Sequence, residues 1–371
     1  MTKYGMLVET LKSDIFSGKY GAQNPFPSIR SLIHRFRLSD STVQRAFDEL
    51  TNMGLIARKQ GRGTFVTKQG ASRKIGLIMP GVAYSTFFEP IVSEIYRLAC
   101  ENEYMLQIGE TYSHDATRRL GEVRDLAASF VRQRVAGVIF QPHVGTSEAV
   151  ELNQRILNVF ARAKIPVVAL DDEITTSSGE IACDVVGIDD VNAGVRLAKH
   201  LIGKGVQRIH FLLHSFSDSC DPADENRLCG VMAAIVRHGL PFDMKKSVLR
   251  AAPDDVVALK RHLRHGCPDA FICSNDAAAA IFRQTLATAG LDVPQDVMLA
   301  GFGDLPISAL MSPPLTTMQQ HPGSIAKEAF RRLLAKIDDP TLMPVKVSVV
   351  SPLVARASTD GREWRLHKRK R

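Results

Sequence analysis

Apolar residues recur at helical spacing in three short segments near the amino terminus. Leu7, Leu11 and Ile15 lie four residues apart, which predicts a helix that ends near Gly18. A second apolar face follows Ser28, which we expect to cap the helix that begins after Pro27. Its apolar positions are Ile29, Leu32, Ile33 and Phe36.

A third helix is predicted after Ser39, with Gly54 at the position where a helix end favours a left-handed residue. Its apolar stripe consists of Val43, Ala46, Phe47 and Leu50. The opposite face carries Ser41, Thr42, Gln44, Arg45 and Asp48, which are polar groups of the kind that reach phosphates and base edges. The basic segment 54–66, which contains three glycines, then predicts a hairpin. Three helices and a hairpin indicate a winged helix-turn-helix, and we interpret the third helix as the recognition helix.

Beyond residue 74 the pattern changes to short apolar runs that alternate with longer amphipathic segments. The runs span residues 75–79, 105–108, 135–140, 166–170, 209–213, 270–273 and 297–302. Strands that are apolar on both faces and lie between helices are typical of a parallel α/β sheet. A break near residue 187 predicts two such lobes with a cleft between them.

With 371 residues the chain is long enough for two or three domains. The polar stretch 67–74 has a linker composition. We therefore expect a DNA-binding domain over 1–67, a linker over 68–74, a two-lobed domain for effector binding and dimerisation over 75–357, and a basic tail over 358–371.

The positive charge is concentrated at the two ends. Residues 1–74 contain 13 Lys and Arg against 5 Asp and Glu, and residues 361–371 contain 6 against 1, although the whole chain carries only +8. A basic patch confined to one domain indicates contact with nucleic acid. For the basic tail we expect either non-specific affinity for DNA or no function.

The first 67 residues resemble the GntR family of bacterial regulators. The matching positions are 27–32, Ser39, 41–43, 45–46, Leu50, 54–56 and 60–66. By this resemblance Arg30 and Thr42 contact DNA, and Gln60 and Gly61 at the wing tip, beside Arg62, enter the minor groove. Asp40 and Gln44 stand where the family commonly has arginine, so we expect an operator that differs from the family's commonest site.

The remaining chain, from about 74 to 357, resembles the LacI/GalR regulators and the related periplasmic sugar-binding proteins. The residues that carry the likeness are segments 189–194, 227–230, 273–277, 301–304 and 313–318. The combination of both parts resembles the arabinose repressor class. No LacI-type head with its hinge helix is present, so that hinge mechanism does not transfer.

The resemblance implies a sugar-like effector between the lobes, near the carboxyl ends of the strands. From the second half of the chain Arg227, Asn275 and Asp304 would contribute, and from the first half Ser85, Phe87, Phe88 and Asp171. Each polar position also fits a plainer interpretation. Asp171 fits a strand-end turn, Arg227 a surface charge, and Asn275 a helix cap.

Gly303 departs from the pattern of many sugar-responsive members, which have an aspartate there. Loss of that carboxylate alters selectivity among hydroxylated ligands. It also leaves open a regulator whose cleft no longer binds a ligand.

An α/β enzyme is the alternative from another class. The adjacent carboxylates Asp171-Asp172 and Asp189-Asp190 point in different directions on a strand or helix, and His210 and His214 lie too far apart on a strand to share a site. The sequence contains no phosphate-binding loop, nucleophile elbow or H-E-x-x-H run. We expect no catalysis, cofactor or metal.

The cysteines predict neither a zinc site nor a redox motif, because none of the six forms a C-x-x-C pair. No secretion signal or membrane-spanning run is evident. The sequence thus predicts a cytoplasmic, homodimeric transcription regulator, most simply a repressor, that binds operator DNA and a small carbohydrate-derived effector.

Overall fold

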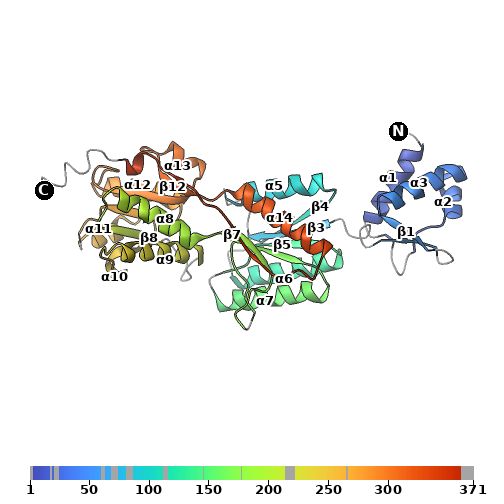
Figure 1. Cartoon of the computed structure of the whole chain (residues 1–371), viewed down its shortest axis with the longest axis horizontal. Coiled ribbons are helices and arrows are strands. Elements are labelled where there is room, and N and C mark those ends of the chain that lie inside the picture. Colours follow the sequence, from blue (N-terminus) through green and yellow to red (C-terminus); the bar gives the residue numbers. More distant parts are fainter. Residues whose placement is uncertain are drawn as a thin grey trace.

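The structure is a computed structural model of the whole chain. It describes residues 3–16, 19–20, 25–59, 63–67, 74–80, 87–111, 116–144, 146–176, 178–213, 222–264 and 266–360. Figure 1 shows a small amino-terminal head and two α/β lobes.

The head consists of three helices and a two-stranded antiparallel sheet. These elements are α1 (Lys3–Phe16), α2 (Ile29–Phe36), α3 (Asp40–Asn52), β1 (Ile56–Lys59) and β2 (Gly63–Val66). The apolar stripes predicted from the sequence meet in one core, in which Leu11, Leu32 and Phe47 are almost completely buried. Ser28 and Ser39 cap α2 and α3 as expected, and Gly54 has a positive φ of 68°.

The first lobe is a six-stranded, entirely parallel sheet with the order β13-β7-β6-β5-β3-β4. Its strands are β3 (Lys74–Pro80), β4 (Met105–Thr111), β5 (Gly137–Phe140), β6 (Val167–Leu170), β7 (Asp184–Ile188) and β13 (Lys346–Val349). Helices α5 (Phe88–Glu101) and α14 (Pro322–Asp338) cover one face, and α6 (Ala116–Arg132) and α7 (Ser147–Arg162) cover the other.

The second lobe has the order β14-β12-β11-β10-β8-β9, with only β14 antiparallel to its neighbour. Its strands are β8 (Ile209–Leu213), β9 (Val248–Arg250), β10 (Ala270–Cys273), β11 (Met298–Gly303), β12 (Thr316–Gln319) and β14 (Leu353–Val354). Its helices are α8 (Asp190–Gly203), α9 (Pro222–Arg237), α10 (Met244–Ser247), α11 (Val256–Leu263), α12 (Asp276–Thr288), α13 (Pro306–Leu310) and the 3-10 helix η2 (Ala357–Thr359).

The chain crosses between the lobes three times. The first crossing, at Asp189 between β7 and α8, lies close to the break predicted near residue 187. The second passes through Gln320 and His321, and the third passes through residues 350–352. His321 adopts a left-handed conformation, with φ 49° and ψ 60°, which residues other than glycine rarely adopt. The sequence pattern predicted only the first crossing, so α14 and β13 return to the first lobe unexpectedly.

Two predicted boundaries need correction. Lys74, expected to end the linker, is the first residue of β3 and lies opposite Met105 in β4. The expected tail begins too early, because Ser358 and Thr359 are each only 1% exposed. Ser358 Oγ donates a hydrogen bond of 2.6 Å to the carbonyl of Leu299, which ties η2 to the second sheet.

Candidate functional sites

The exposed face of α3 is held in place by a cap and a buried stripe. Ser39 Oγ accepts a hydrogen bond from the backbone N–H of Thr42 at 3.4 Å, and the two hydroxyls lie 2.7 Å apart. The buried side of α3 fixes the rotation of the helix, because Val43, Phe47 and Leu50 are at most 1% exposed. Ser41, Gln44 and Arg45 therefore project to solvent, and Thr42 is half-buried.

Two arginines, one in α3 and one in β1, contact aromatic rings of the head. The guanidinium carbon of Arg45 lies 4.7 Å from the ring centre of Tyr4 in α1, a cation–π arrangement that orients Arg45 on the exposed face. Arg58 of β1 lies 5.1 Å from the ring centre of Phe47 and 3.5 Å from Asp48. Asp48, although on the predicted recognition face, thus helps to hold the hairpin against α3.

The remaining residues predicted to bind DNA lie on α2 and in the hairpin. Arg30 is the second residue of α2 and its side chain is exposed. The strands β1 and β2 pair antiparallel from Ile56 opposite Val66 to Lys59 opposite Gly63, as a wing requires. The tip residues Gln60, Gly61 and Arg62 lie outside the described residues.

In the first lobe, three of the residues expected at the effector site lie at strand ends and a helix start. Asp171 follows β6 with a positive φ of 58°, and its backbone N–H donates to the carbonyl of Val186 at 2.9 Å. Phe87 and Phe88 begin α5, with ring centres 5.5 Å apart, and both are half-buried against the core. Ser85 lies outside the described residues.

Gly187 in β7 makes the tight turn at Asp171 possible. A Cβ atom on Gly187 would lie 2.8 Å from both Cα and Oδ1 of Asp171, which is too close for any other residue. Asp171 is therefore held against the neighbouring strand at the end of the sheet. This placement agrees with the strand-end turn.

Arg227 is a buried ion-pair centre, so the interpretation as a surface charge is wrong. Helix α9 begins at Pro222 and not at Arg227, which places Arg227 in the second turn at 6% exposure. Its Nε donates to Asp190 Oδ1 at 2.8 Å, and its Nη1 donates to Asp224 Oδ1 at 3.2 Å and to the carbonyl of Ser274 at 2.8 Å. The guanidinium also lies 5.2 Å from the ring centre of Phe302.

Asn275 serves as the cap of α12. Its Oδ1 accepts a hydrogen bond of 2.8 Å from the backbone N–H of Ala278, which satisfies one of the free donors at the helix start. The plainer interpretation of Asn275 as a helix cap therefore describes this contact.

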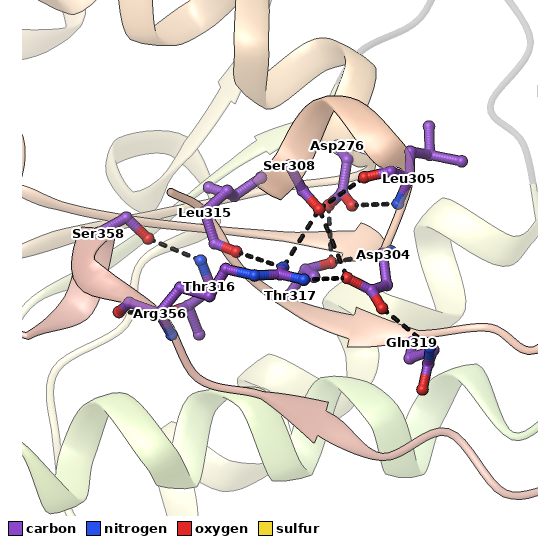
Figure 2. Close-up of polar contacts among 10 residues, drawn as sticks. All are labelled: Asp276, Asp304, Leu305, Ser308, Leu315, Thr316, Thr317, Gln319, Arg356 and Ser358. Atoms are coloured by element: carbon purple, nitrogen blue, oxygen red, sulfur yellow. Dashed lines mark hydrogen bonds and ion pairs between the residues drawn. The ribbon is translucent and has the colours of Figure 1, made fainter. Parts of the chain in front are cut away.

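Asp304 lies in a dense polar network at the carboxyl end of β11 (Figure 2). Its Oδ1 accepts from Arg356 Nη2 at 2.6 Å, and its Oδ2 accepts from Gln319 Nε2 at 2.9 Å. Arg356 Nη1 also donates to Ser308 Oγ at 3.2 Å and to the carbonyl of Leu315 at 2.9 Å. Asp304 thus joins β11, β12, α13 and the segment after β14.

The residue beside it, Gly303, has a φ of 134°, in the region that favours glycine. An aspartate at this position would be strained on this backbone. Glycine in place of the family's aspartate at position 303 is consequently required by the local backbone conformation, and it also changes the chemistry of the site.

A buried carboxyl group supports the same network. Asp276 is completely buried, and this burial raises its pKa to about 6 against the lowering effect of hydrogen bonds from Thr317 Oγ1 and the Leu305 N–H. Those bonds are 2.7 and 3.0 Å long. Asp276 therefore anchors the loop after β11, although it was not among the residues predicted for the site.

Four buried polar atoms at strand ends have no hydrogen-bond partner among the described residues. They are Glu110 Oε2, Thr111 Oγ1, Gln141 Oε1 and Ser274 Oγ. Thr111 ends β4, Gln141 follows β5, and Ser274 follows β10, so both lobes contribute. An unsatisfied buried polar group costs about 1–3 kcal/mol, which suits atoms that bond a ligand.

Gln141 and Ser274 are absent from the residues predicted by sequence, although a signal was present. Each residue directly follows a predicted apolar run, where ligands of parallel sheets collect. Among the described residues there is no cluster of three or more metal-ligating side chains. No helix in the described part of the chain is long and apolar enough to cross a membrane.

Two cysteines of the described residues lie in the cores of the lobes. Cys183 and Cys273 are buried, and burial raises the pKa of the Cys183 thiol to about 12 and that of Cys273 well above its usual value. Such thiols are unreactive. Cys220 lies outside the described residues.

Comparison with known proteins identifies the two parts of the chain. Residues 3–66 match the gntR family of bacterial regulatory proteins, and residues 198–359 match a periplasmic binding protein-like domain. The chain therefore combines a GntR-type DNA-binding head with a periplasmic binding protein-like domain.

Two named repressors are similar to most of the chain. The chain is 25% identical over 372 residues to the arabinose metabolism transcriptional repressor of Geobacillus stearothermophilus, covering 97% of this chain and 98% of that protein. It is 26% identical over 294 residues to the ribose operon repressor of Escherichia coli strain K12, covering 78% and 83% of the two chains.

Solved structures share the fold. The complex of the transcriptional regulator CelR with cellobiose has a TM-score of 0.63 at 20% identity, over 95% of this chain and 98% of that one. A periplasmic binding protein/LacI regulator from Alkaliphilus metalliredigens QYMF, complexed with D-xylulofuranose, has a TM-score of 0.60 at 23% identity, over 78% and 100%.

Proposed function

We propose that the protein is a cytoplasmic repressor whose affinity for operator DNA is controlled by a small carbohydrate-derived effector. The proposal rests on two features that occur in one chain. The head has a capped helix with a polar face, and the strand ends of the two-lobed body contain buried polar atoms without a hydrogen-bond partner among the described residues. The names of the relatives, which include repressors of arabinose and ribose genes, support the same regulatory role.

In this proposal α3 enters the major groove and Ser41, Thr42, Gln44 and Arg45 face the bases and phosphates. Arg30 contacts the backbone from α2, and Gln60, Gly61 and Arg62 reach the minor groove from the wing. An exposed, uncapped helix end would fray, so the Ser39–Thr42 contact favours a rigid reading surface.

The effector would lie at the carboxyl ends of the strands of the two sheets. Thr111 and Gln141 from the first lobe and Ser274 from the second offer hydroxyl and amide groups, which suit a polyhydroxylated ligand. Phe87 and Phe88 would supply apolar surface, with Ser85, Asp171, Arg227, Asn275 and Asp304 around them. The ion pairs of Arg227 and Asp304 favour positioning roles for these two residues.

A homodimer fits the symmetry of a palindromic operator. Exposed apolar side chains support it in both lobes. Ile281 on α12 and Leu310 on α13 are 47% and 79% exposed, and Tyr96 on α5 and Met105 on β4 are 58% and 61% exposed. A second copy of the chain would cover such surfaces. Leu310→Asp should then lower the mass measured by sedimentation.

A thermal-shift screen tests the effector proposal. The purified full chain is heated with sugars, sugar phosphates and polyols, because a ligand that binds only the native state stabilises it by mass action. We expect at least one sugar to raise the melting temperature in a saturable way. If no carbohydrate shifts the temperature at millimolar concentration, the proposed effector class is wrong.

A further inference from the structure

One edge of the first lobe carries a cluster of cations. Because the strands are parallel and the helices run back between them, the ends of helices and the starts of strands share an edge, which we call the amino edge. Arg132 and Arg134 lie between α6 and β5, and Arg162 and Lys164 lie between α7 and β6. All four side chains are exposed.

Three of these cations are not neutralised within the described part of the chain. Arg132, Arg162 and Lys164 form no ion pair with any described residue, whereas arginines elsewhere in the same lobe do, such as Arg155 with Glu151. The acidic residues Glu103 and Asp338 of the amino edge follow or end α5 and α14, which cover the other face of the sheet. The edge is therefore polarised, with the positive side under α6 and α7.

Two of the four cations occupy backbone positions that favour glycine. Arg134 and Lys164 have φ values of 54° and 57°, the left-handed conformation that usually ends a helix at glycine. A long cationic side chain is unfavourable for the backbone at such a position. The backbone conformation therefore does not explain why both positions carry a cation. The dipole at a helix end also favours a cation there.

The amino edge is tethered close to the head. Thr67, the last described residue of the head, donates its N–H to the carbonyl of Leu55 at 3.0 Å, and β3 starts on the amino edge at Lys74. The seven chain steps between Thr67 and Lys74 span no more than about 25 Å when fully extended. The tether therefore keeps the head, and any DNA that it binds, attached to this edge of the first lobe.

We propose that the positive side of the amino edge, formed by Arg132, Arg134, Arg162 and Lys164, is a second DNA-contacting surface. It would bind the phosphate backbone next to the segment that the head occupies. This inference rests on the proposed function, since it requires that the head bind DNA. Four exposed cations on one edge complement the negative charge of a duplex, which presents about one phosphate charge per 1.7 Å of helix axis.

The test is the salt dependence of DNA binding by the full-length chain. Fluorescence anisotropy of a labelled random-sequence duplex of about 40 base pairs gives the slope of log K against log salt concentration. This slope changes by about 0.9 for each phosphate that the protein no longer neutralises. The variant Arg134→Gly/Lys164→Gly suits the test, because glycine fits both backbone positions and the melting temperature should not fall.

Two controls separate a local contact from a change in net charge. Lys245→Gln/Lys246→Gln removes the same charge from exposed α10 of the second lobe, and Glu103→Gly changes a left-handed residue on the acidic side of the edge, where φ is 59°. We expect the edge variant to weaken binding about tenfold at low salt and to flatten the slope by about 1 to 2. Both controls should keep the parent slope.

The outcomes distinguish this inference from the proposed function. An edge variant with the parent slope and affinity, or a Lys245/Lys246 variant with an equal reduction, overturns the second surface while the head remains a DNA-binding domain. If the parent chain itself fails to bind the duplex at low salt, both the second surface and the proposed function are wrong.

Discussion

Arg227 Nε in α9 donates a hydrogen bond of 2.8 Å to Asp190 Oδ1 at the start of α8, immediately after the first crossing between the lobes. Glycines bring the two helices together. A Cβ atom on Gly194 would lie 2.2 Å from the carbonyl oxygen of Arg227, and one on Gly230 would lie 1.9 Å from that of Val191. The crossing is thus braced by a buried charge pair where the two helices approach closely.

Replacing Arg227 should destabilise the protein strongly. Arg227→Ala leaves Asp190 and Asp224 as buried carboxylates without their cation, which typically costs about 3–5 kcal/mol. The urea unfolding midpoint measures the change. Arg237→Ala, at the exposed end of the same helix, is the control and should change stability by less than about 0.5 kcal/mol. Equal stability of the two variants would contradict the bracing role.

Ser274→Ala should behave in the opposite way. The hydroxyl of Ser274 is completely buried and has no partner among the described residues, so its removal should leave the ligand-free protein unchanged or up to about 1 kcal/mol more stable. The variant should nevertheless reduce the melting shift produced by the effector, because that hydroxyl would bond the ligand.

Thr285→Val provides the matched control for Ser274→Ala. Its buried hydroxyl donates to the carbonyl of Pro253 at 2.7 Å, so the substitution should lower stability by about 1 kcal/mol and preserve the ligand shift. A full ligand shift in Ser274→Ala would remove Ser274 from the site.

The network around Asp304 should contribute to folding more than to effector binding. Asp304→Ala leaves Arg356 Nη2 and Gln319 Nε2 without the carboxylate acceptor, and we expect stability to fall by about 2–3 kcal/mol. Asp360→Ala breaks only the exposed pair with Lys204 and should be nearly neutral. If Asp304→Ala kept parental stability and abolished the ligand shift, Asp304 would bind the ligand directly.

Acidification should destabilise the second lobe through a buried histidine pair. His210 Nδ1 lies 2.8 Å from His262 Nε2, and burial, followed by the charge of His262, lowers the pKa of His210 to about 4. Between pH 6.5 and 4 the unfolded chain binds a proton that the folded protein does not. The stabilisation that comes from keeping His210 neutral is therefore complete above pH 6.5 and disappears towards pH 4.

The free energy of unfolding should fall by about 2 kcal/mol through this pair, a value that already allows for the remaining exposure of the pair to water. Asp276 acts with the opposite sign, because its raised pKa makes the folded protein bind a proton between about pH 6 and 3.8. Denaturant unfolding from about pH 7 to 4.5 should thus show a shallow decline in the parent. In His210→Asn stability should rise on acidification, and a decline as steep as the parent's would exclude the pair as the cause.

Arg30→Ala should weaken DNA binding several-fold without changing the effector's melting shift, since Arg30 is exposed on α2 in the head and the effector would bind in the body. Lys12→Ala, which removes a cation paired with Glu9 on α1, serves as the control in the same domain. Loss of both DNA binding and thermal stability in Arg30→Ala would mean that the residue maintains the fold.

Much of the architecture follows from periodicity. The caps Ser28 and Ser39, the apolar stripe with Phe47, and seven strands of the body appear where the pattern predicts them, because local spacing determines which face is buried. The return of α14 and β13 to the first lobe depends on tertiary pairing of β13 with β7, which no local pattern encodes.

The site is less predictable for a related reason. Arg227 lies within α9 and Asp304 follows β11, and only the fold reveals that each is paired with a partner distant in sequence. Gln141 and Ser274 do not stand out in the sequence because a polar residue after an apolar run is common. Their significance comes from the missing hydrogen-bond partner among the described residues, which is a three-dimensional property.

The central claim is that an effector changes the affinity of the full chain for its own operator, and the direct measurement is that affinity with and without effector. The operator is obtained by selecting bound duplexes from a random pool, and the effector is a sugar that raises the melting temperature. An effector that regulates DNA binding must bind the DNA-bound and DNA-free forms of the protein with unequal affinity, so we predict at least about a fivefold change in operator affinity at saturation. Equal affinities with and without the bound sugar would contradict this claim and indicate a regulator whose DNA binding is independent of the ligand.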